Sequence, residues 1–371
     1  MIFNNEERLR EILENSDRKI VIYGAGMIGQ TIVPYLVESN NLYDRLICYF
    51  DADLNKQKIT IDIQGHKYTV GKSEEIRAIS RDTIVLITNS NFAPIVEMLD
   101  GIDELAQNEA FILPILNAEA AHNKTPANIE LKKSRTQLIP KKIHYCWFSG
   151  NPMPEYLVKC IESWERLCPD YEIVRWDENN YDITKNLYMK QAYEAGKWGF
   201  VPDIARLDIL YRHGGIYLDT DVEMVKRPDD LLYQEGFVGV EKWGNVNMGG
   251  CSGAVAGHPM IKCLLDFRKE ENFVNEDGSL NTMTCGYYET LPLIKLGMKP
   301  DNTVQEVGGM TIYSSEFFHP YDYMSGEIDR TKNTFSIHHF NGGWLDAKRR
   351  EERQKTVNNY RKMLERMRGA L

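Results

Sequence analysis

The sequence has no long run of apolar residues and no excess of basic side chains. A membrane-spanning helix needs about 20 consecutive, mostly apolar residues, and no segment of this 371-residue chain approaches that length. Non-specific binding to nucleic acid needs a basic surface, whereas the formal net charge here is -10. The composition, 43% hydrophobic and 26% charged, is that of a folded globular protein. We therefore expect no membrane span and no nucleic-acid partner.

The seven cysteines lack the pattern of a disulfide framework or a zinc site. Their number is odd, and no two of them stand in a CxxC spacing. The polar first residues, MIFNNEERLREILENSDRK, have no apolar core of the kind that a signal peptide carries. Because unpaired cysteines are typical of reducing compartments, we expect a cytoplasmic protein that contacts a membrane only peripherally, at its inner face.

Residues 1–120 alternate between apolar strands and helices, which predicts a small Rossmann-like domain with a parallel sheet. The stretch KIVIYGAGMIG indicates a buried strand, a glycine turn and the start of a helix. Gly24, Gly26 and Gly29 form the GxGxxG spacing, and Asp51 follows at the distance of a ribose-binding carboxylate. Two interpretations stay open: the turn binds NAD(P) or another nucleotide, or its glycines serve only the packing of the turn.

A second α/β domain is predicted over residues 138–345, after a polar linker at 121–137. The apolar pattern restarts at IPKKIHYC and continues through a helix to the strand YEIVRWD. A further helix, VPDIARLDILYRHGG, has Pro202 at its first position and Gly214 at its carboxyl end, where these residues are favoured. This helix leads directly into the strand GIYLDTD.

Two carboxylates, Asp219 and Asp221, stand two residues apart at the end of that strand. On a regular strand such residues share a face, and like charges at that distance repel. Carboxylate oxygens are the ligands that hard divalent cations prefer, and a bound cation converts the repulsion into attraction. The pair therefore predicts a Mn²⁺ or Mg²⁺ site that serves a diphosphate.

Four motifs occur in order in this second domain: IHYCWFSG, SWERLCPDYEIVRWDE, DIARLDILYRHGGIYLDTDV and HHFNGGW. Together they resemble the DxD-containing, family 32-like glycosyltransferases, which include toxin glucosyltransferase domains, yeast initiating mannosyltransferases and capsular polysaccharide transferases. The resemblance implies a GT-A fold that binds a nucleotide sugar, a UDP-sugar by preference. It also implies transfer of the sugar with retention of its anomeric configuration.

The resemblance further implies roles for individual residues. Trp147 would stack on the nucleobase of the donor, Asp203 would bind hydroxyls of the donor sugar, and Arg206 would reach the diphosphate. Asp219 would contact the ribose and the sugar, and would reach the metal through water, whereas Asp221 would be a direct metal ligand. The alternative for Asp203 and Arg206 is an ordinary surface ion pair, because residues three apart on a helix share a face.

The last motif and a central strand supply the remaining candidates. His339, or in second place His338, would complete the metal site, and Trp344 would donate its indole N–H to the leaving phosphate. Asn247 is a candidate contact to the donor sugar. No residue presents itself as a nucleophile, so we expect front-face displacement, in which the leaving diphosphate takes the proton of the acceptor.

Residues 346–371 predict a basic amphipathic helix at the carboxyl end of the sequence. Its apolar stripe consists of Val357, Tyr360, Leu364, Met367 and Leu371. One interpretation is contact with an anionic membrane that carries a lipid-linked acceptor. The other is that the helix packs on its own protein.

The sequence thus predicts a metal-dependent, retaining hexosyltransferase that acts in bacterial surface or capsular polysaccharide synthesis. Its partners would be a nucleotide-sugar donor and a saccharide or lipid-linked saccharide acceptor. Two alternatives remain: an NAD(P)-dependent sugar-nucleotide enzyme centred on GAGMIG, and a regulatory protein that binds nucleotide sugars through an inactive DxD site.

Overall fold

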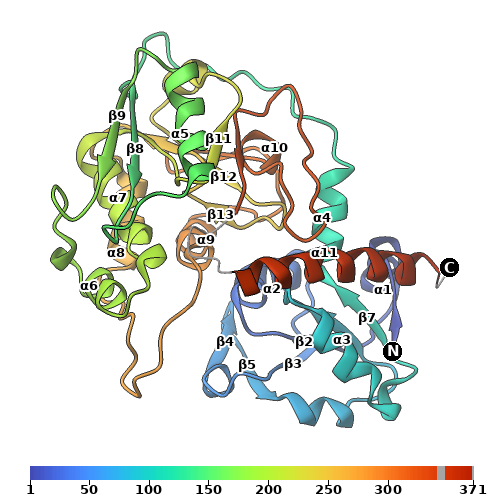
Figure 1. Ribbon diagram of the computed structural model, residues 1–371. Coiled ribbons are helices and arrows are strands. Elements are labelled where there is room, and N and C mark those ends of the chain that lie inside the picture. Colours follow the sequence, from blue (N-terminus) through green and yellow to red (C-terminus); the bar gives the residue numbers. More distant parts are fainter. Residues whose placement is uncertain (341–346, 370–371) are drawn as a thin grey trace. The chain divides into compact units, whose positions relative to one another are not determined.

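The computed structural model describes residues 1–340 and 347–369 and divides the chain into two compact units (Figure 1). The first unit consists of Met1–Lys124, Met324–Gly326 and Arg350–Leu371, and the second of Thr125–Tyr323 and Glu327–Arg349. The first unit therefore runs past residue 120, because helix α4 (Leu113–His122) belongs to it. It also takes in the carboxyl-terminal helix, which the sequence treats as a separate segment.

The first unit contains a seven-stranded sheet in the order β1-β7-β6-β2-β3-β5-β4. All neighbouring strands run parallel except β4 and β5, which pair antiparallel at one edge. Every residue of β2 and β6 is buried, as expected for parallel strands covered on both faces. The strands are β1 (Ile2–Phe3), β2 (Ile20–Tyr23), β3 (Leu46–Asp51), β4 (Thr60–Ile63), β5 (His66–Lys72), β6 (Ile84–Ile87) and β7 (Glu109–Ile112).

The helices of this unit follow the strands in the predicted alternation. They are α1 (Glu6–Asn15), α2 (Met27–Ser39), α3 (Ala93–Asp100), α4 and α11 (Ala347–Arg368). The apolar run FILPIL is strand only up to Ile112, because Pro114 sits in the first turn of α4, where its missing N–H costs nothing.

The glycine turn after β2 packs tightly on itself. Gly24 has a φ of +117°, and a Cβ on Gly29 would lie 2.2 Å from the carbonyl oxygen of Gly24. Asp51 accepts a hydrogen bond of 2.8 Å from the backbone N–H of Ala25. The glycines thus have a packing role in the turn, and Asp51 holds that turn in place. Binding of NAD(P) or another nucleotide by Gly24, Gly26, Gly29 and Asp51 stays a prediction.

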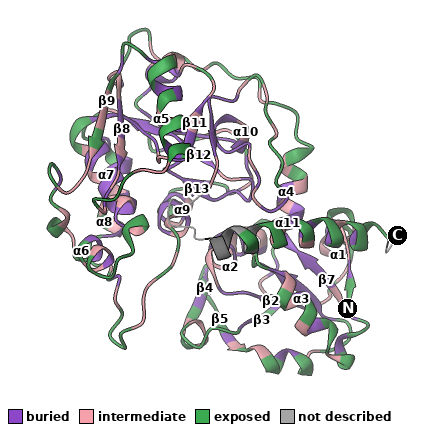
Figure 2. Ribbon diagram, viewed as in Figure 1, coloured by how far each residue is buried: buried purple, intermediate pink, exposed green. Residues whose placement is uncertain are grey.

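Helix α11 packs its apolar stripe on the first unit. Of the predicted stripe, Val357, Tyr360 and Met367 are buried and Leu364 is partly buried, and the neighbouring Met363 is buried as well (Figure 2). The hydroxyl of Tyr360 donates a hydrogen bond of 2.6 Å to Glu119. This stripe is therefore occupied by packing, which favours the second interpretation of the helix over contact with a membrane. Leu371 lies outside the described residues.

An ion pair at the far end of α11 supports the same packing. The guanidinium of Arg366 binds the carboxylate of Asp100 at 2.6 Å and lies over the ring of Phe3, 4.5 Å from its centroid. Arg366 also donates to the carbonyl oxygen of Met1 at 3.0 Å. The two ends of the chain are thereby joined within one unit.

The second unit is built on an eight-stranded sheet with the path β15-β16-β12-β14-β10-β8-β9, and β13 pairs with β12. It mixes parallel and antiparallel pairs: β8 is parallel to both β9 and β10, while β14 is antiparallel to β10 and β12. A separate two-stranded sheet joins β11 and β17. The strands are β8 (Lys142–Cys146), β9 (Glu172–Trp176), β10 (Gly215–Tyr217), β11 (Val222–Met224), β12 (Gly236–Val240), β13 (Val246–Asn247), β14 (Ser252–Ala254), β15 (Gln305–Val307), β16 (Met310–Tyr313) and β17 (Ser336–His338).

Two apolar cores form in this unit, and alternate residues of β10 and of the position after it contribute to different ones. Tyr217 belongs to the first core, whereas Ile216 and Leu218 belong to the second. The helices are α5 (Glu155–Leu167), α6 (Leu187–Glu194), α7 (Pro202–His213), α8 (Pro259–Phe267), α9 (Cys285–Lys295) and α10 (Ser315–Phe318). The predicted α/β class, with a parallel-sheet domain first, is confirmed.

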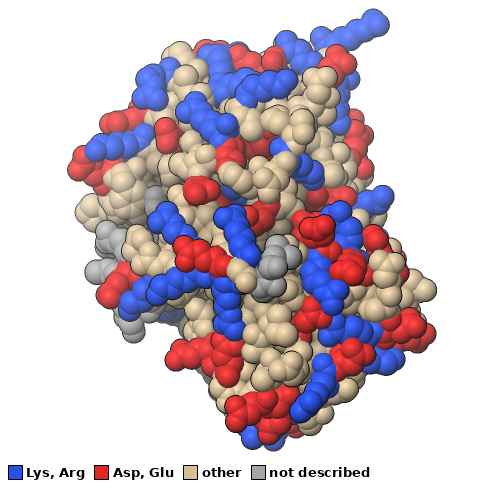
Figure 3. Space-filling view, turned by 90° about the vertical axis from the view of Figure 1, so that its right-hand side faces the viewer, with Lys and Arg blue, Asp and Glu red and all other residues tan. Residues whose placement is uncertain are grey.

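The described helices and one face of the surface can be compared with the composition. Within the ranges 1–340 and 347–369, no helix is both long and apolar enough to cross a bilayer. On the face shown in Figure 3, basic and acidic side chains of the described residues are interspersed rather than separated into patches of one sign.

Replacing Met363 of α11 with lysine should destabilise the first unit. The substitution Met363→Lys removes a buried apolar side chain and forces an ammonium group against the unit, at a cost of about 3 kcal/mol. Urea unfolding of the full chain measures this cost. Asn358→Lys adds the same residue at an exposed position of the same helix and should have little effect. Equal destabilisation by both variants would contradict the packing of α11.

Candidate metal centre

The candidate site begins where helix α7 turns into strand β10. The helix starts at Pro202 and ends at His213, and Gly214, which caps its carboxyl end, has a φ of +62°. The next residue, Gly215, also has a positive φ, of +101°, and a Cβ there would lie 2.9 Å from the carbonyl oxygen of Lys142 on β8. Glycine is therefore required for β10 to enter the sheet beside β8.

Asp219 and Asp221 lie in a turn between β10 and β11 rather than on a regular strand. The N–H of Asp219 donates to the carbonyl oxygen of Gly249 at 2.8 Å, and the carbonyl of Asp219 accepts from the N–H of Val222 at 3.1 Å. The alternation of a strand therefore does not fix the directions of the two carboxylates. The turn can direct both toward one point.

Asp219, Asp221 and His338 form the one group of three potential metal ligands found among the described residues. One ligand atom from each lies within 4.8 Å of the others, and Nε2 of His338 is 3.3 Å from Oδ1 of Asp221. The side chains of His338 and Asp221 are buried. Burial lowers the pKa of His338, but the carboxylate of Asp221 outweighs it and raises the pKa above the usual value. Two carboxylates and an imidazole suit Mn²⁺ well and Mg²⁺ less well.

The structure corrects the predicted histidine ligand from His339 to His338. Strand β17 pairs antiparallel with β11, and His338 stands opposite Val222. Successive residues at the end of a strand point to opposite faces. The ring of His339 lies 3.1 Å from the carboxylate of Glu223, and its backbone N–H donates to the carbonyl oxygen of Asp221. His339 is therefore not placed as a metal ligand.

Arg206 is buried beside the metal triad. Its Nη2 lies 2.8 Å from the carboxylate of Asp203 and 3.6 Å from that of Asp219, and its side chain is only 3% exposed. Burial lowers the pKa of Arg206, but Asp219 and Asp203 outweigh this effect and keep the guanidinium charged. Asp203 and Arg206 thus form a buried pair and not the surface ion pair that their spacing also allowed. The Arg206 guanidinium lies close enough to the triad to bind an anion held there.

Glu289, on helix α9, is a site residue that sequence reasoning missed. Its Oε1 is 3.6 Å from Nη1 of Arg206, and its Oε2 accepts a hydrogen bond of 2.8 Å from the N–H of Met248. Burial raises the pKa of Glu289 to about 7, although Arg206 opposes the shift. Nothing in the segment TMTCGYYETL marks this glutamate, because its partners come from distant parts of the chain.

Trp147 follows the last residue of β8, which runs parallel to β10. The carboxyl ends of parallel strands meet at one edge of a sheet, so Trp147 lies at the same edge as the DxD turn. The ring is half-buried, and its N–H donates to the carbonyl oxygen of Asn151 at 2.8 Å. A role in stacking on a nucleobase stays a prediction. Trp344 lies outside the described residues.

Asn247 supports Asp219 through the backbone of Gly249. Its Nδ2 donates to Glu241 and its Oδ1 accepts from the N–H of Gly249, both at 2.8 Å. Gly249 in turn packs against Asp219, since a Cβ on Gly249 would lie 1.9 Å from Oδ2 of that carboxylate. In this structure Asn247 therefore positions the Gly249 backbone, and its predicted contact with a sugar remains untested.

Placing a methyl group on Gly249 should damage the metal centre. Gly249→Ala drives a Cβ into the carboxylate of Asp219, and displacement of a supporting contact of this kind weakens metal binding about tenfold or more. Titration calorimetry with Mn²⁺ measures the affinity. The control is Gly101→Ala, whose Cβ would approach no atom closer than 3.4 Å. An unchanged affinity in a folded Gly249→Ala variant would argue against Asp219 as part of the site.

The raised pKa of Glu289 predicts a pH dependence of stability. The folded protein holds this proton up to about pH 7, whereas the unfolded chain releases it near the ordinary glutamate pKa of 4.5. The stabilising contribution is therefore complete below about 4.5 and is lost as the pH rises through 7, by about 3 kcal/mol at most. Glu289→Gln has no proton to lose, so the stability of the wild type relative to this variant should fall over that interval.

Urea unfolding at several pH values tests this expectation. The matched control is Glu276→Gln, which makes the same change at an exposed position. A difference between wild type and Glu289→Gln that stays constant with pH would show that folding does not raise the pKa of Glu289.

Comparison with known proteins adds an independent observation. Residues 154–238, from helix α5 to strand β12, match the family model described as the glycosyltransferase sugar-binding region containing a DXD motif. An inositol phosphoceramide mannosyltransferase of Schizosaccharomyces pombe is 31% identical over 138 residues, which cover 36% of this chain and 38% of that protein. A mannosyl phosphorylinositol ceramide synthase of Saccharomyces cerevisiae is 31% identical over 154 residues, covering 38% and 39%.

The chain thus spans about two fifths of the length of these relatives. A solved structure of the PaToxG glycosyltransferase covers 49% of this chain and 76% of its own, at 17% identity and a TM-score of 0.35. The matched segment contains Asp203, Arg206, Asp219 and Asp221, whereas His338 and Glu289 lie beyond it. The match of residues 154–238, which include the DxD turn and the helix before it, to this sugar-binding region agrees with the resemblance that the sequence motifs indicated.

Proposed function

We propose that this protein is a metal-dependent glycosyltransferase that moves a hexose from a nucleotide sugar to a saccharide acceptor. The observation that carries the proposal is the group Asp219, Asp221 and His338 beside the buried cation of Arg206. A Mn²⁺ or Mg²⁺ ion held by this group supplies positive charge for a leaving diphosphate. The family match over residues 154–238 supports the same reaction class.

Arg206 has the properties needed to bind the diphosphate. Its Nη1 has no hydrogen-bond partner among the described residues, although the side chain is buried. A planar guanidinium binds phosphate oxygens strongly. Asp203 bonds Nη2 and so fixes the orientation of the guanidinium. In the proposed complex Asp203 also binds hydroxyls of the donor sugar, and Trp147 stacks on the nucleobase.

We further propose that the reaction retains the anomeric configuration by front-face displacement. The bond from the sugar to the diphosphate breaks, the bond to the acceptor oxygen forms on the same face, and the leaving diphosphate takes the acceptor proton. The family resemblance supports retention. Asp203 accepts a hydrogen bond from Arg206, and Glu289 accepts one from the N–H of Met248. Because both carboxylates are engaged by other groups, we favour a route that needs no carboxylate nucleophile.

The remaining features of the function rest on the sequence. We propose a UDP-sugar as donor, an acceptor that is a free or lipid-linked saccharide, and a role in bacterial surface or capsular polysaccharide synthesis in the cytoplasm. The names of the yeast relatives, one a mannosyltransferase and one a mannosyl phosphorylinositol ceramide synthase, support transfer of a hexose. Contact with the inner face of a membrane would have to use surfaces other than the buried stripe of α11.

Asp221→Asn should abolish sugar transfer. The variant keeps the shape of the side chain but removes the charge, so we expect the rate of nucleoside diphosphate release to fall about a hundredfold or more. The measurement is release of UDP or GDP from a panel of UDP- and GDP-hexoses with Mn²⁺, and chelation by EDTA should have the same effect. Asp266→Asn, at an exposed position of α8, is the matched control.

The possible results of this screen separate the three sequence interpretations. Binding of a nucleotide sugar without any release of the diphosphate would favour the regulatory protein. Release that persists in Asp221→Asn and in EDTA would contradict a metal-dependent transferase. Turnover that requires NAD(P) would instead point to the glycine turn of the first unit.

A further inference from the structure

Strand β13 forms an edge of the sheet in the second unit. Within the described residues it pairs with β12 alone. The carbonyl oxygen of Asn245 faces β12, because it accepts a hydrogen bond of 2.7 Å from the N–H of Glu241. Directions alternate along an extended chain, so the N–H groups of Val246 and Met248 point away from β12. These buried donors need partners that no neighbouring strand supplies.

Helix α9 supplies both partners. Oγ1 of Thr290 accepts from the N–H of Val246 at 2.9 Å, and Oε2 of Glu289 accepts from the N–H of Met248 at 2.8 Å. Both side chains are buried, and α9 lies beside β13 (Figure 1). Two adjacent helix residues thus take the place of a neighbouring strand at this edge.

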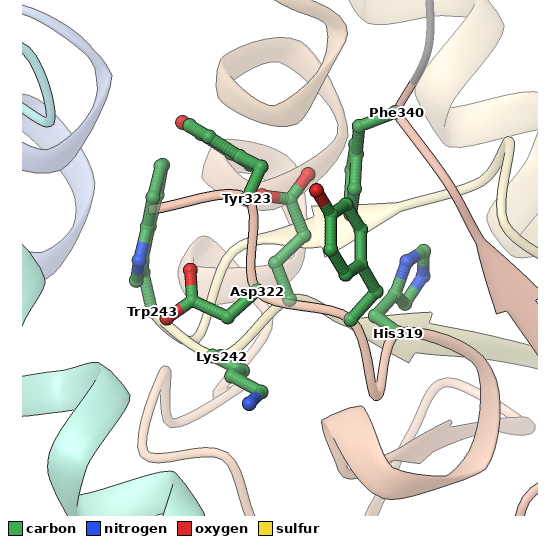
Figure 4. A pocket seen from close by; sticks show the side chains of 8 residues that line it. Lys242, Trp243, His319, Asp322, Tyr323 and Phe340 are labelled. Carbon is green, nitrogen blue, oxygen red and sulfur yellow. The ribbon is translucent and has the colours of Figure 1, made fainter. Parts of the chain in front are cut away.

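The tip of the hairpin formed by β12 and β13 is held by packing instead. Gly244 has a φ of +93°, and a Cβ there would lie 2.2 Å from the carbonyl oxygen of Pro300. The rings of Trp243 and Tyr323 meet edge to face, with centroids 5.2 Å apart, and Figure 4 shows them side by side at a small pocket. The tip is therefore fixed by these contacts, whereas the chain that leaves the hairpin is bound by α9.

This outgoing chain holds one of the three potential metal ligands. We call residues 246–249 the β13 segment. Its last residue, Gly249, accepts the N–H of Asp219 on its carbonyl oxygen at 2.8 Å, and a Cβ on Gly249 would lie 1.9 Å from Oδ2 of Asp219. The carbonyl oxygen of Met248 is held by the hydroxyl of Ser252 at 2.8 Å. A displacement of the β13 segment would therefore displace Asp219.

Glu289 also joins the β13 segment to the buried cation. Its Oε1 lies 3.6 Å from Nη1 of Arg206, while its Oε2 binds the N–H of Met248. Arg206 in turn lies 3.6 Å from the carboxylate of Asp219 through its Nη2. These contacts close a ring from Arg206 through Glu289, Met248, Gly249 and Asp219 back to Arg206. In such a ring, a shift of one member changes the contacts of the others.

We propose that Thr290 and Glu289 are positioning residues of the candidate metal centre. They hold the β13 segment, and the β13 segment holds Asp219 in the triad with Asp221 and His338. This inference deepens the proposed function and rests on it, because the triad serves a reaction only if the protein is a metal-dependent transferase. Binding of Mn²⁺ needs no sugar, so the positioning can be measured separately from transfer.

The test removes the acceptor that Thr290 offers to the β13 segment. Thr290→Val replaces the hydroxyl with a methyl group and leaves the buried N–H of Val246 without its partner. We expect the affinity for Mn²⁺ to fall about tenfold, as it does when groups that orient metal ligands are lost. Thr290→Ser keeps the hydroxyl and should restore most of the affinity. Titration calorimetry of the full chain with Mn²⁺ alone measures each value.

A matched control separates positioning from general loss of stability. Thr31→Val makes the same change at a buried threonine of α2 in the first unit, where the hydroxyl donates to the carbonyl oxygen of Met27 at 2.8 Å. It should lower the stability measured by urea unfolding without changing the affinity for Mn²⁺. Thr290→Ala, which also removes the acceptor, replaces Thr290→Val if that variant does not fold.

Release of nucleoside diphosphate from a sugar nucleotide gives a second readout. In Thr290→Val the Mn²⁺ concentration for half-maximal release should rise about tenfold, while the rate at saturating Mn²⁺ stays within about threefold of wild type. A variant that is merely less stable would lose rate at every Mn²⁺ concentration.

Each outcome bears on the inference or on the proposed function. An unchanged Mn²⁺ affinity in a folded Thr290 variant, an equal loss in Thr31→Val, or no recovery in Thr290→Ser overturns the inference, even if nucleotide sugars release their diphosphate. A wild-type chain that binds no Mn²⁺ overturns it as well. Mn²⁺ affinity that depends on Thr290 in a protein that releases no diphosphate from any donor supports the positioning role and refutes the proposed function.

Discussion

The burial of a single guanidinium, that of Arg206, determines how the second unit is held together around its site. An ion of this size loses several kcal/mol when it leaves water, so it persists in an interior only when acceptors surround it. Its partners come from three elements: Asp203 from the same helix, Asp219 from the turn after β10, and Glu289 from α9. The cation therefore fixes α7, the DxD turn and α9 relative to one another.

The same cluster holds more negative than positive charge, and this excess accounts for the raised pKa values of Glu289 and His338. Three carboxylates face one cation, and Asp221 stands close by. The protein reduces the negative charge by keeping a proton on Glu289 up to about pH 7 and by raising the pKa of His338. A divalent cation would reduce it more strongly. Protons and a metal ion both reduce this negative charge, so proton binding and metal binding should compete with each other.

Local patterns in the sequence predicted what depends on local chemistry. Pro202 and Gly214 delimit α7 because each has a backbone preference that holds in any fold. The identity of the metal-binding histidine depends on the pairing of β11 with β17, two strands far apart in the chain. A shift of one residue in that pairing would exchange His338 for His339, and no local pattern fixes it. Glu289 escaped prediction for the same reason.

The place of α11 bears on the order in which the protein becomes complete. The first unit contains Met1–Lys124 but is completed only by Arg350–Leu371, which are synthesised after the second unit. Domains that are continuous in sequence can fold while the ribosome is still at work on the rest. Here the apolar surface that receives Val357, Tyr360, Met363 and Met367 must wait uncovered until the whole second unit has been translated. A nascent chain with this arrangement would be most vulnerable to aggregation and proteolysis in the interval before α11 emerges, and a stop codon ahead of α11 would leave that surface permanently open.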